Sequence, residues 1–311
     1  MQNEEKEKGL LFRKYRREGD IGISKIIMDH LVYLPKILEA ATWVHGFEDH
    51  YEIRSFLPDS SQGLEYQFLA QNEEAADRVL AFYKETMQKE ALKVFAAYWT
   101  LANQRGSFEY TAPFSEIMGQ ICCGSRESKF NTEERSRFWV LSKFLQGTKL
   151  NIIVRYQTKK EPRRIILCHR LLDINALDDK ENITILKEGE YPGKVQVKVL
   201  DYKQFEEKSQ IATSISRETA RLEPEDIMLA LAIQTRASQV RDVGSFQMSR
   251  SKVIELSHLQ KTNASNPRVA KKRITSKMDK FQEKKIVDKW STKDDQYRIE
   301  RKLSKIEVDK D

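Results

Sequence analysis

The sequence predicts an α+β fold in which one unit of helix, strand, short helix, long helix and hairpin occurs twice, after an N-terminal α/β region. The first observation is a near-repeat: GSFEYT at Gly106–Thr111 and GSFQMS at Gly244–Ser249 lie 138 residues apart. The second is that an apolar helical pattern precedes each segment, over Leu92–Gln104 and Ile227–Gln239. A shared order of elements at a nearly constant offset indicates an internal duplication.

This pattern divides the chain into five segments. We expect residues 1–88 to form an accessory region, 89–201 the first repeat with a β extension, 202–222 a linker, 223–303 the second repeat, and 304–311 a charged tail. The accessory region carries no recognisable chemistry. An accessory domain, a dimerisation surface and a partner-binding arm are all compatible with it.

The accessory region contains a helical pattern followed by strand patterns. Gly22–Trp43 is apolar enough for a buried helix, which Pro35 is expected to split. The segments EIRSFL and EYQFLA flank the turn PDSSQG and predict two strands between Tyr51 and Leu69. Asn72, followed by two glutamates, predicts the start of the next helix.

The first repeat has a clear start or stop signal at most of its elements. Pro113 opens a short helix, and Asn131 with Glu134 forms a capping box that opens a long one. Leu150–Tyr156 and Arg164–Leu172 predict the two strands of its hairpin, joined by the basic turn QTKKEPR, and ENITIL and KVQVKVL predict further strands. The predicted core positions of the helices are Leu92, Phe95, Tyr98, Trp99, Leu101, Phe114, Ile117, Met118, Phe138, Leu141, Phe144 and Leu145.

The second repeat begins with a helix at Pro224 and contains a short helix over Arg250–Leu259. Asn266 suits the N-cap of its long helix, which extends to Lys285, and Pro267 suits the first helical position. A hairpin of IVDKW, the turn STKDDQ and YRIERK follows. The residues expected on the core face of the long helix are Val269, Ile274, Met278 and Phe281.

The remaining faces of this long helix are strongly basic. Eight cations against Asp279 and Glu283 give +6, nearly the whole net charge of +7 of the 311-residue chain. Surface helices usually mix charges of both signs, so this helix is expected to meet a polyanion. The eight cations are Arg268, Lys271, Lys272, Arg273, Lys277, Lys280, Lys284 and Lys285.

A basic helix followed by a short hairpin is typical of a winged helix on double-stranded DNA, with the helix in the major groove and the hairpin beside the phosphates. In the second repeat the residues expected to contact DNA are the eight helix cations and, on the hairpin, Lys289, Lys293 and Arg298. Of the helix residues, those suited to read bases are Arg268, Lys272, Arg273 and Ser276. In the first repeat the expected contacts are Arg135, Arg137 and Lys143 on the helix and Arg155, Lys159, Lys160, Arg163 and Arg164 on the hairpin.

The sequence lacks the motifs of several enzyme classes. It contains no G-x-x-x-x-G-K-[ST], G-x-G-x-x-G or G-x-S-x-G segment, and no His-x-His pair. His45 and His50 lack metalloprotease spacing, and adjacent Cys122 and Cys123 cannot form a zinc knuckle. We therefore expect no enzyme activity, catalytic residue, cofactor or metal.

The cellular location is expected to be the cytoplasm. Three cysteines do not make a disulfide framework and suit a reducing compartment. The longest apolar segment, Ile21–Val44, is interrupted by charged residues and a proline, so no membrane span is expected.

The segments Leu92–Gly119, Thr132–Leu145 and Pro267–Trp290 together resemble the plasmid replication initiators of bacteria, the Rep proteins built from two tandem winged-helix domains. The resemblance runs from about Lys89 to Lys302 and does not include the first ninety residues. It implies a homodimer that binds repeated origin sites through its second domain and recruits host replication proteins. Two alternatives share the same domains: a transcriptional regulator with an N-terminal sensing or partner-binding region, and a protein-binding module.

Overall fold

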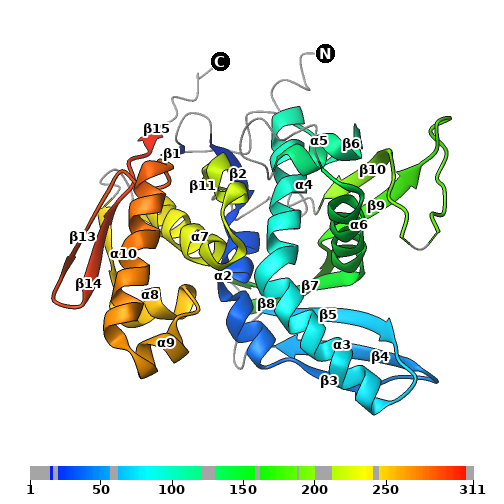
Figure 1. Cartoon of the computed structure of the whole chain (residues 1–311), viewed down its shortest axis with the longest axis horizontal. Helices are drawn as coiled ribbons and strands as arrows, with labels where there is room; N and C mark the ends of the chain where they lie inside the picture. Colours follow the sequence, from blue (N-terminus) through cyan, green and yellow to red (C-terminus); the bar gives the residue numbers. More distant parts are fainter. Residues whose placement is uncertain are drawn as a thin grey trace. The chain divides into compact units, whose positions relative to one another are not determined.

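The computed structural model describes residues 15–16, 20–56, 62–120, 130–157, 162–187, 189–199, 212–240 and 245–305 (Figure 1). The chain forms two compact units. The central unit is Tyr33–Asp201, and the C-terminal unit combines Met1–Val32 with Tyr202–Asp311. The first residues of the chain therefore belong to the same unit as the last.

The central unit contains two antiparallel sheets and four α-helices in the part that the structure describes, besides the end of α2 (Lys25–Glu39). The five-stranded sheet has the order β3-β4-β5-β7-β8, and the three-stranded sheet has the order β6-β10-β9. The elements are β3 (Thr42–His45), β4 (His50–Phe56), β5 (Gln62–Leu69), α3 (Glu73–Thr86), η1 (Met87–Ala91), α4 (Leu92–Arg105), β6 (Glu109–Pro113), α5 (Phe114–Gly119), α6 (Thr132–Gly147), β7 (Thr148–Gln157), β8 (Pro162–Arg170), β9 (Leu172–Leu177) and β10 (Lys194–Val199).

The first repeat folds around an aromatic core, as its periodicity predicts. All twelve predicted core positions of its helices are buried. The Tyr98 hydroxyl donates to Ser142 Oγ at 2.9 Å, and the Tyr110 hydroxyl donates to the Tyr98 carbonyl at 3.0 Å, so both buried tyrosine hydroxyls have partners. The predicted capping box is present, with Glu134 N donating to Asn131 Oδ1 at 2.8 Å and Asn131 N to Glu134 Oε2 at 3.0 Å.

The hairpin predicted to close the first repeat belongs to the five-stranded sheet and not to the three-stranded sheet that contains β6. Strands β7 and β8 do pair with each other, but β7 also pairs with β5, from Tyr66↔Thr148 to Gln62↔Ile152. The sheet that contains β6 is completed instead by β10 and β9. The pair β7–β8 is therefore an insertion between α6 and the hairpin β9–β10. Local sequence identifies the two consecutive strands of a hairpin, whereas long-range packing decides which further strand the hairpin pairs with.

The segment ENITIL does not form the predicted strand. Ile183 makes an isolated bridge to Leu177 within a loop that connects β9 and β10. The Asp178 carboxylate organises this loop, because its Oδ1 accepts the backbone N–H groups of Lys180 and Asn182, both at 2.8 Å. A side chain that satisfies two turn amides competes with strand pairing.

The C-terminal unit joins short N-terminal strands to a three-stranded antiparallel sheet and its helices. That sheet has the order β12-β14-β13, in which the last strand lies between the other two, as in β6-β10-β9. The elements are β1 (Tyr15–Arg16), β2 (Ile21–Ser24), β11 (Ala212–Ile215), η3 (Arg217–Arg221), α7 (Pro224–Gln239), β12 (Ser245–Ser249), α8 (Arg250–Leu256), α9 (Gln260–Ser265), α10 (Pro267–Glu283), β13 (Lys289–Lys293), β14 (Gln296–Glu300) and β15 (Ser304–Lys305).

Two further expectations differ from the structure. Helix α2 continues through Pro35, which does not split it. Leu34, Ile37 and Leu38 are buried around this proline, and apolar burial offsets the lost backbone hydrogen bond. The stretch expected to be a linker is structured in part, because β11 pairs with β2 and η3 follows it.

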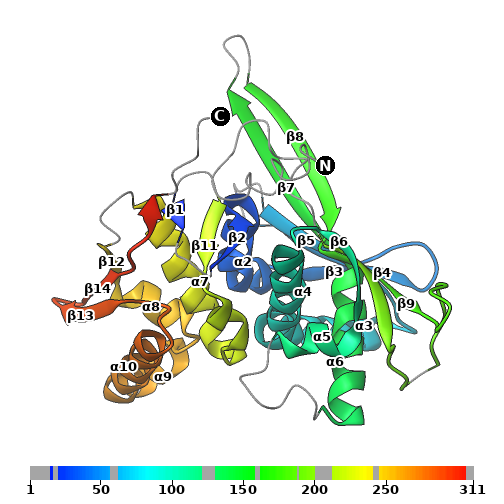
Figure 2. The same ribbon diagram turned by 90° about the horizontal axis from the view of Figure 1, so that it is seen from above.

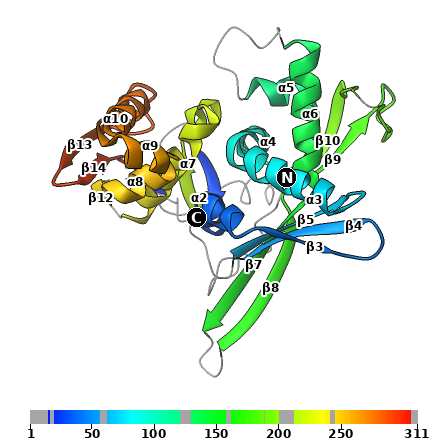
Figure 3. The ribbon, with the colours of Figure 1, turned by 60° about the horizontal axis from the view of Figure 1, so that its bottom comes forward.

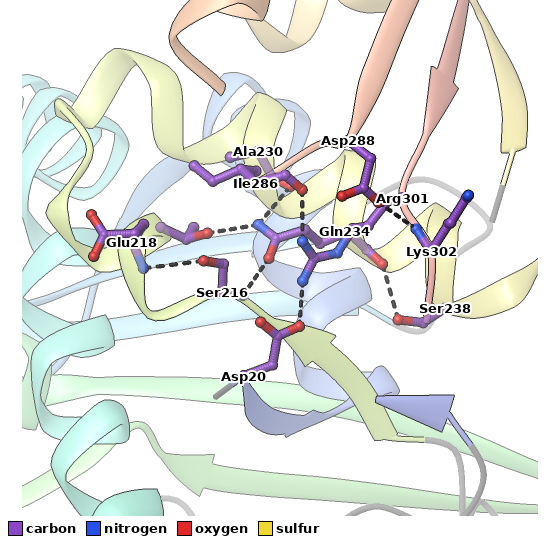
Figure 4. A network of polar contacts seen from close by, with 11 residues as sticks. Asp20, Ser216, Glu218, Ala230, Gln234, Ser238, Ile286, Asp288, Arg301 and Lys302 are labelled. Atoms are coloured by element: carbon purple, nitrogen blue, oxygen red, sulfur yellow. Dashed lines mark hydrogen bonds and ion pairs between the residues drawn. The ribbon is translucent and has the colours of Figure 1, made fainter. Parts of the chain in front are cut away.

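A buried polar network ties the N-terminal segment to the rest of the C-terminal unit (Figure 4). The Arg301 side chain is fully buried, donates to the Ile286 carbonyl at 2.6 Å and forms an ion pair with Asp20. Beside it, Gln234 accepts from Ser216 N at 2.5 Å and donates to Thr219 Oγ1 at 2.6 Å. Charges buried this deeply are stable only when they are paired.

We predict that Arg301→Met lowers the free energy of unfolding by about 3–5 kcal/mol, because it leaves the buried Asp20 carboxylate without its guanidinium partner. Chemical denaturation of the full chain measures this. Arg298→Met, which changes an exposed arginine on β14 just before Arg301, is the control and should change stability by about 0.5 kcal/mol or less. Adding Asp20→Asn to Arg301→Met should recover part of the loss. Equal stability of Arg301→Met and the wild type would contradict this role.

Candidate nucleic-acid interface

Helix α10 is held in the C-terminal unit by one apolar stripe. Asn266 Oδ1 accepts from Val269 N at 3.2 Å, and Pro267 takes the first helical position, as the sequence predicts. The stripe consists of Ala270, Ile274, Met278 and Phe281, each fully buried. Val269 was expected in this stripe but is 39% exposed, because Ala270 has the spacing of four residues to Ile274 that places both on one face.

The cations of α10 fall into two groups, and the first is neutralised within the unit. Lys277 and Lys280 both form ion pairs with Asp226 of α7, the latter at 2.9 Å, and Lys284 Nζ lies 3.8 Å from Glu218 Oε2. The Asp226 side chain is only 6% exposed. These predicted DNA contacts therefore anchor the flank of α10 to α7 and η3.

Asp226 is kept ionised by this arrangement. Burial alone would raise the pKa of its carboxyl group, but the hydrogen bonds from Lys277 and Lys280 outweigh burial and hold the pKa below the ordinary value of 3.8. A depressed pKa in the folded state means that ionised Asp226 stabilises the fold.

The second group consists of exposed cations in the first half of α10. None of them has a hydrogen bond or ion pair to any residue that the structure describes, and no acidic residue lies between Pro267 and Met278. The acids of the helix, Asp279 and Glu283, lie in its second half, where Asp279 accepts from Trp290 Nε1 at 3.2 Å. Positive charge is thus concentrated near the N-terminus, where the helix dipole is also positive. The group is Arg268, Lys271, Lys272 and Arg273.

A pocket of about 240 Å³ reaches from Lys271 of this group to the turn of the hairpin β13–β14. Its lining brings together Lys271 of α10, Lys293 of β13 and Arg250 of α8. Asp294 and Asp295, also in the lining, form a two-residue turn with φ of 49° and 57°. Arg250 N donates to the Asp295 carbonyl at 2.9 Å, and its guanidinium lies 3.2 Å from Asp295 Oδ1.

Arg250 lines this pocket although the sequence-based prediction did not include it. Its place in the pocket depends on the register Ser249↔Gln296, which brings the start of α8 to the hairpin turn. Ser249 and Gln296 are 47 residues apart, and no local sequence pattern predicts a pairing over that separation.

Arg298 lies on the other face of the sheet from α10. Its neighbours Tyr297 and Ile299 are buried, whereas Arg298 is exposed and donates to Ser245 Oγ at 3.3 Å. The register Trp290↔Ile299 puts these two residues on one face, and the bond from Trp290 to Asp279 shows that this face meets α10. The structure therefore does not bring Arg298 to the free cations of α10.

The corresponding helix of the first repeat, α6, has no comparable basic face. Arg137 Nε lies 2.9 Å from Glu90 Oε2, and the Arg135 guanidinium lies 5.5 Å from the centre of the Tyr191 ring. Lys143 donates to the Ile174 carbonyl at 3.1 Å, and burial lowers the pKa of this lysine. Three cations and two acids give α6 a charge of +1, whereas six cations and two acids give α10 a charge of +4.

Of the hairpin residues predicted to contact DNA in the first repeat, three lie in described strands and two do not. Arg155 lies in β7, and Arg163 and Arg164 lie in β8, all outside the sheet that contains β6. Lys159 and Lys160 lie outside the described residues.

Ser276 of α10 is exposed and follows Arg268 and Lys272 at intervals of four residues along the same face.

The part of the chain that the structure describes offers no group of three or more His, Cys, Asp or Glu side chains that could hold a metal ion. None of the helices described there is long and apolar enough to cross a membrane.

Comparison with known proteins adds a distant structural likeness. No family model matches the chain, and no curated protein is similar to it. A crystal structure of domains 2 and 3 of RctB, as its selenomethionine derivative, is similar with a TM-score of 0.43 and 11% identity, over 88% of this chain and 97% of that one. At this TM-score the likeness defines neither the fold nor the function, so both rest on the geometry described above.

We predict that Asp226→Asn lowers the free energy of unfolding at pH 7 by about 1–3 kcal/mol, because it removes the ionised partner of two lysines. The pKa of Asp226 is depressed in the fold, so this contribution is complete well above 3.8 and is lost as the pH falls through the folded-state pKa. Denaturation between pH 7 and pH 2 should therefore show the two curves converging in acid.

Glu225→Gln, on the exposed neighbouring position of α7, is the control and should leave stability nearly unchanged. A constant difference between Asp226→Asn and the wild type over the whole pH range would contradict the ion-pair account.

Proposed function

We propose that this chain is a sequence-specific, non-enzymatic DNA-binding protein whose C-terminal unit is a winged helix with α10 as its recognition helix. The observation that carries the proposal is the group of four exposed and unpaired cations among the described residues of one capped helix, Arg268, Lys271, Lys272 and Arg273. A set of like charges on rigid backbone, without partners in its own fold, fits a polyanion.

The arrangement of elements supports this assignment. The order helix, strand, helices and hairpin, with β14 between β12 and β13, leaves α10 and the hairpin side by side (Figure 1). The major groove of B-DNA, about 12 Å wide, admits an α-helix. The buried stripe and the Asp226 ion pairs fix two sides of α10, so its remaining face is the one that can enter the groove.

The helical positions suggest how the free residues divide their roles. Arg268, Lys272 and Ser276 follow one another at intervals of four and form the centre of the exposed face, where they would meet base edges. Lys271 and Arg273 lie to either side of that line, where they would meet phosphates on the two walls of the groove. Lys293, beside Lys271 in the pocket, would extend the phosphate contacts, whereas the Arg250 guanidinium is paired with Asp295.

We further propose that the biological role is initiation of plasmid replication at repeated origin sites by a homodimer, with host replication proteins as partners. The repeated unit and the resemblance of three segments to the Rep proteins support this reading. Cloning the gene with its flanks and testing the fragment for autonomous replication tests it directly. Replication that requires the intact gene and nearby direct repeats is expected of an initiator, whereas operator binding without origin activity would instead indicate a transcriptional regulator.

We predict that Lys272→Ala with Arg273→Ala weakens binding to duplex DNA at least tenfold and reduces the slope of log K against log salt by about one, because Arg273 is the phosphate-directed member of the pair. Fluorescence anisotropy over a salt series measures both quantities. Lys280→Ala with Lys284→Ala is the matched control: it removes the same charge from the engaged flank and leaves Lys277 paired with Asp226. An equal effect of both double variants would contradict the assignment of the face.

A further inference from the structure

A short segment after β9 forms an exposed edge of the central unit. Thr184 N donates to the Ala176 carbonyl at 2.9 Å, and Ile183 makes its isolated antiparallel bridge to Leu177. Since β10 pairs with the other side of β9, this segment lies along the outer side of the three-stranded sheet. Figures 2 and 3 show the chain after β9 projecting past the end of that strand. We call residues 182–187 the edge segment.

The edge segment presents both backbone groups and apolar side chains to solvent. Backbone groups alternate in direction along an extended chain, so those of Ile183 point away from β9, and those of Ile185 continue on the same side. Neither residue has a backbone hydrogen bond to any residue that the structure describes. Ile183 is 65% exposed and Ile185 is 96% exposed. An exposed apolar strand edge is a template for pairing with another chain.

The sequence of the edge segment and its flank is self-complementary in one antiparallel register. About a two-fold axis at Thr184, each residue faces the one equally distant from position 184 in a second copy, so Ile183 faces Ile185. Glu181 and Lys187 lie three residues to either side of Thr184, so an acid faces a base at each end of the pairing. An axis at Ile183 would instead oppose Glu181 and Ile185, and an axis at Ile185 would oppose Ile183 and Lys187.

The two charged residues of this register are accessible. Lys187 is exposed, and the Glu181 side chain is 64% exposed although it forms an ion pair with Lys194 of β10. A carboxylate has about four acceptor sites and can accept from two cations at once. Opposite charges directly across two strands stabilise their pairing, and like charges destabilise it. Charge therefore favours a second copy of this chain as the occupant of the edge.

We propose that the edge segment pairs antiparallel with the edge segment of a second copy and joins the two three-stranded sheets across a two-fold axis. The outward backbone groups of Ile183 would bond to those of Ile185 in the other copy, and the four isoleucines would share one face. The contact is short compared with a stable interface, which buries roughly 800 Å² on each partner, so we expect a weak dimer. This inference rests on the homodimer of the proposed function and does not involve α10.

The test uses two charge reversals in the full chain, Glu181→Lys and Lys187→Glu. In a dimer of either variant, like charges face each other at both ends of the pairing. In a mixed dimer with one copy of each variant, the two introduced residues face each other, and so do the two native ones, so opposite charges meet at both ends. Sedimentation velocity over a concentration series measures each variant alone, and energy transfer between two fluorescent labels measures the mixture.

We expect the dissociation constant of the dimer to rise at least about fivefold in each variant and to return to within about twofold of the wild type in the mixed dimer. A role of Glu181 or Lys187 within its own chain cannot produce such a rescue on mixing. Variants that dimerise as tightly as the wild type would overturn the proposal. A mixed dimer no tighter than the dimers of the separate variants would also overturn it.

Ile183→Thr with Ile185→Thr tests the apolar part of the contact. Threonine is also β-branched and both positions are exposed, so the melting temperature should match that of the wild type while the dimer weakens at least about tenfold. Val140→Thr is the control, because Val140 is 59% exposed on α6 of the same unit, and it should change neither quantity. Dimerisation of the double variant like the wild type would contradict the proposed edge.

The outcomes separate this inference from the proposed function. If the wild type dimerises and none of the edge variants affects the dimer, the homodimer stands and its interface lies elsewhere. If the wild type is monomeric at every concentration, the homodimer and the edge proposal both fail. The edge variants should bind a duplex with one selected site as the wild type does, because α10 is unchanged. Weaker binding there would place the edge segment at the DNA and overturn its assignment to a second copy.

Discussion

The orientation of α10 depends on the ion pairs that Asp226 makes with Lys277 and Lys280. An apolar stripe alone would bury one face of the helix, but a helix can roll about such a stripe. The buried carboxylate adds a directional constraint on one flank, and α7 supplies it. The cations that remain exposed are then those of the first half of the helix, and the hairpin turn and Arg250 lie beside them.

The two repeats share their topology and differ in their use of charge. In both, the last strand lies between the other two, and a capped helix precedes the hairpin. In the first repeat the cations of the helix α6 contact Glu90, the Tyr191 ring and backbone carbonyls of the same unit.

The sequence predicted features that depend on neighbouring residues. The caps at Asn72, Asn131 and Asn266 are present, and the helical core positions of the first repeat are buried. Some errors are local, at Pro35, at ENITIL and at Val269, but the larger ones concern contacts between distant residues. The pairing of β7 with β5 separates the hairpin from its expected sheet, and Lys277 meets an acid 51 residues upstream. A count of basic residues on α10 could not distinguish exposed cations without described partners from those that hold the helix in place.

Lysine reactivity measured by mass spectrometry, with and without duplex DNA, tests the central claim most directly. Lys271 and Lys272 are exposed without described partners, whereas Lys277 and Lys280 are paired with Asp226. The account predicts that acetylation of Lys271 and Lys272 is fast in the free chain and strongly suppressed by DNA, while Lys277 and Lys280 react slowly in both states. Equal reactivity of Lys271 and Lys272 with and without bound DNA would contradict it.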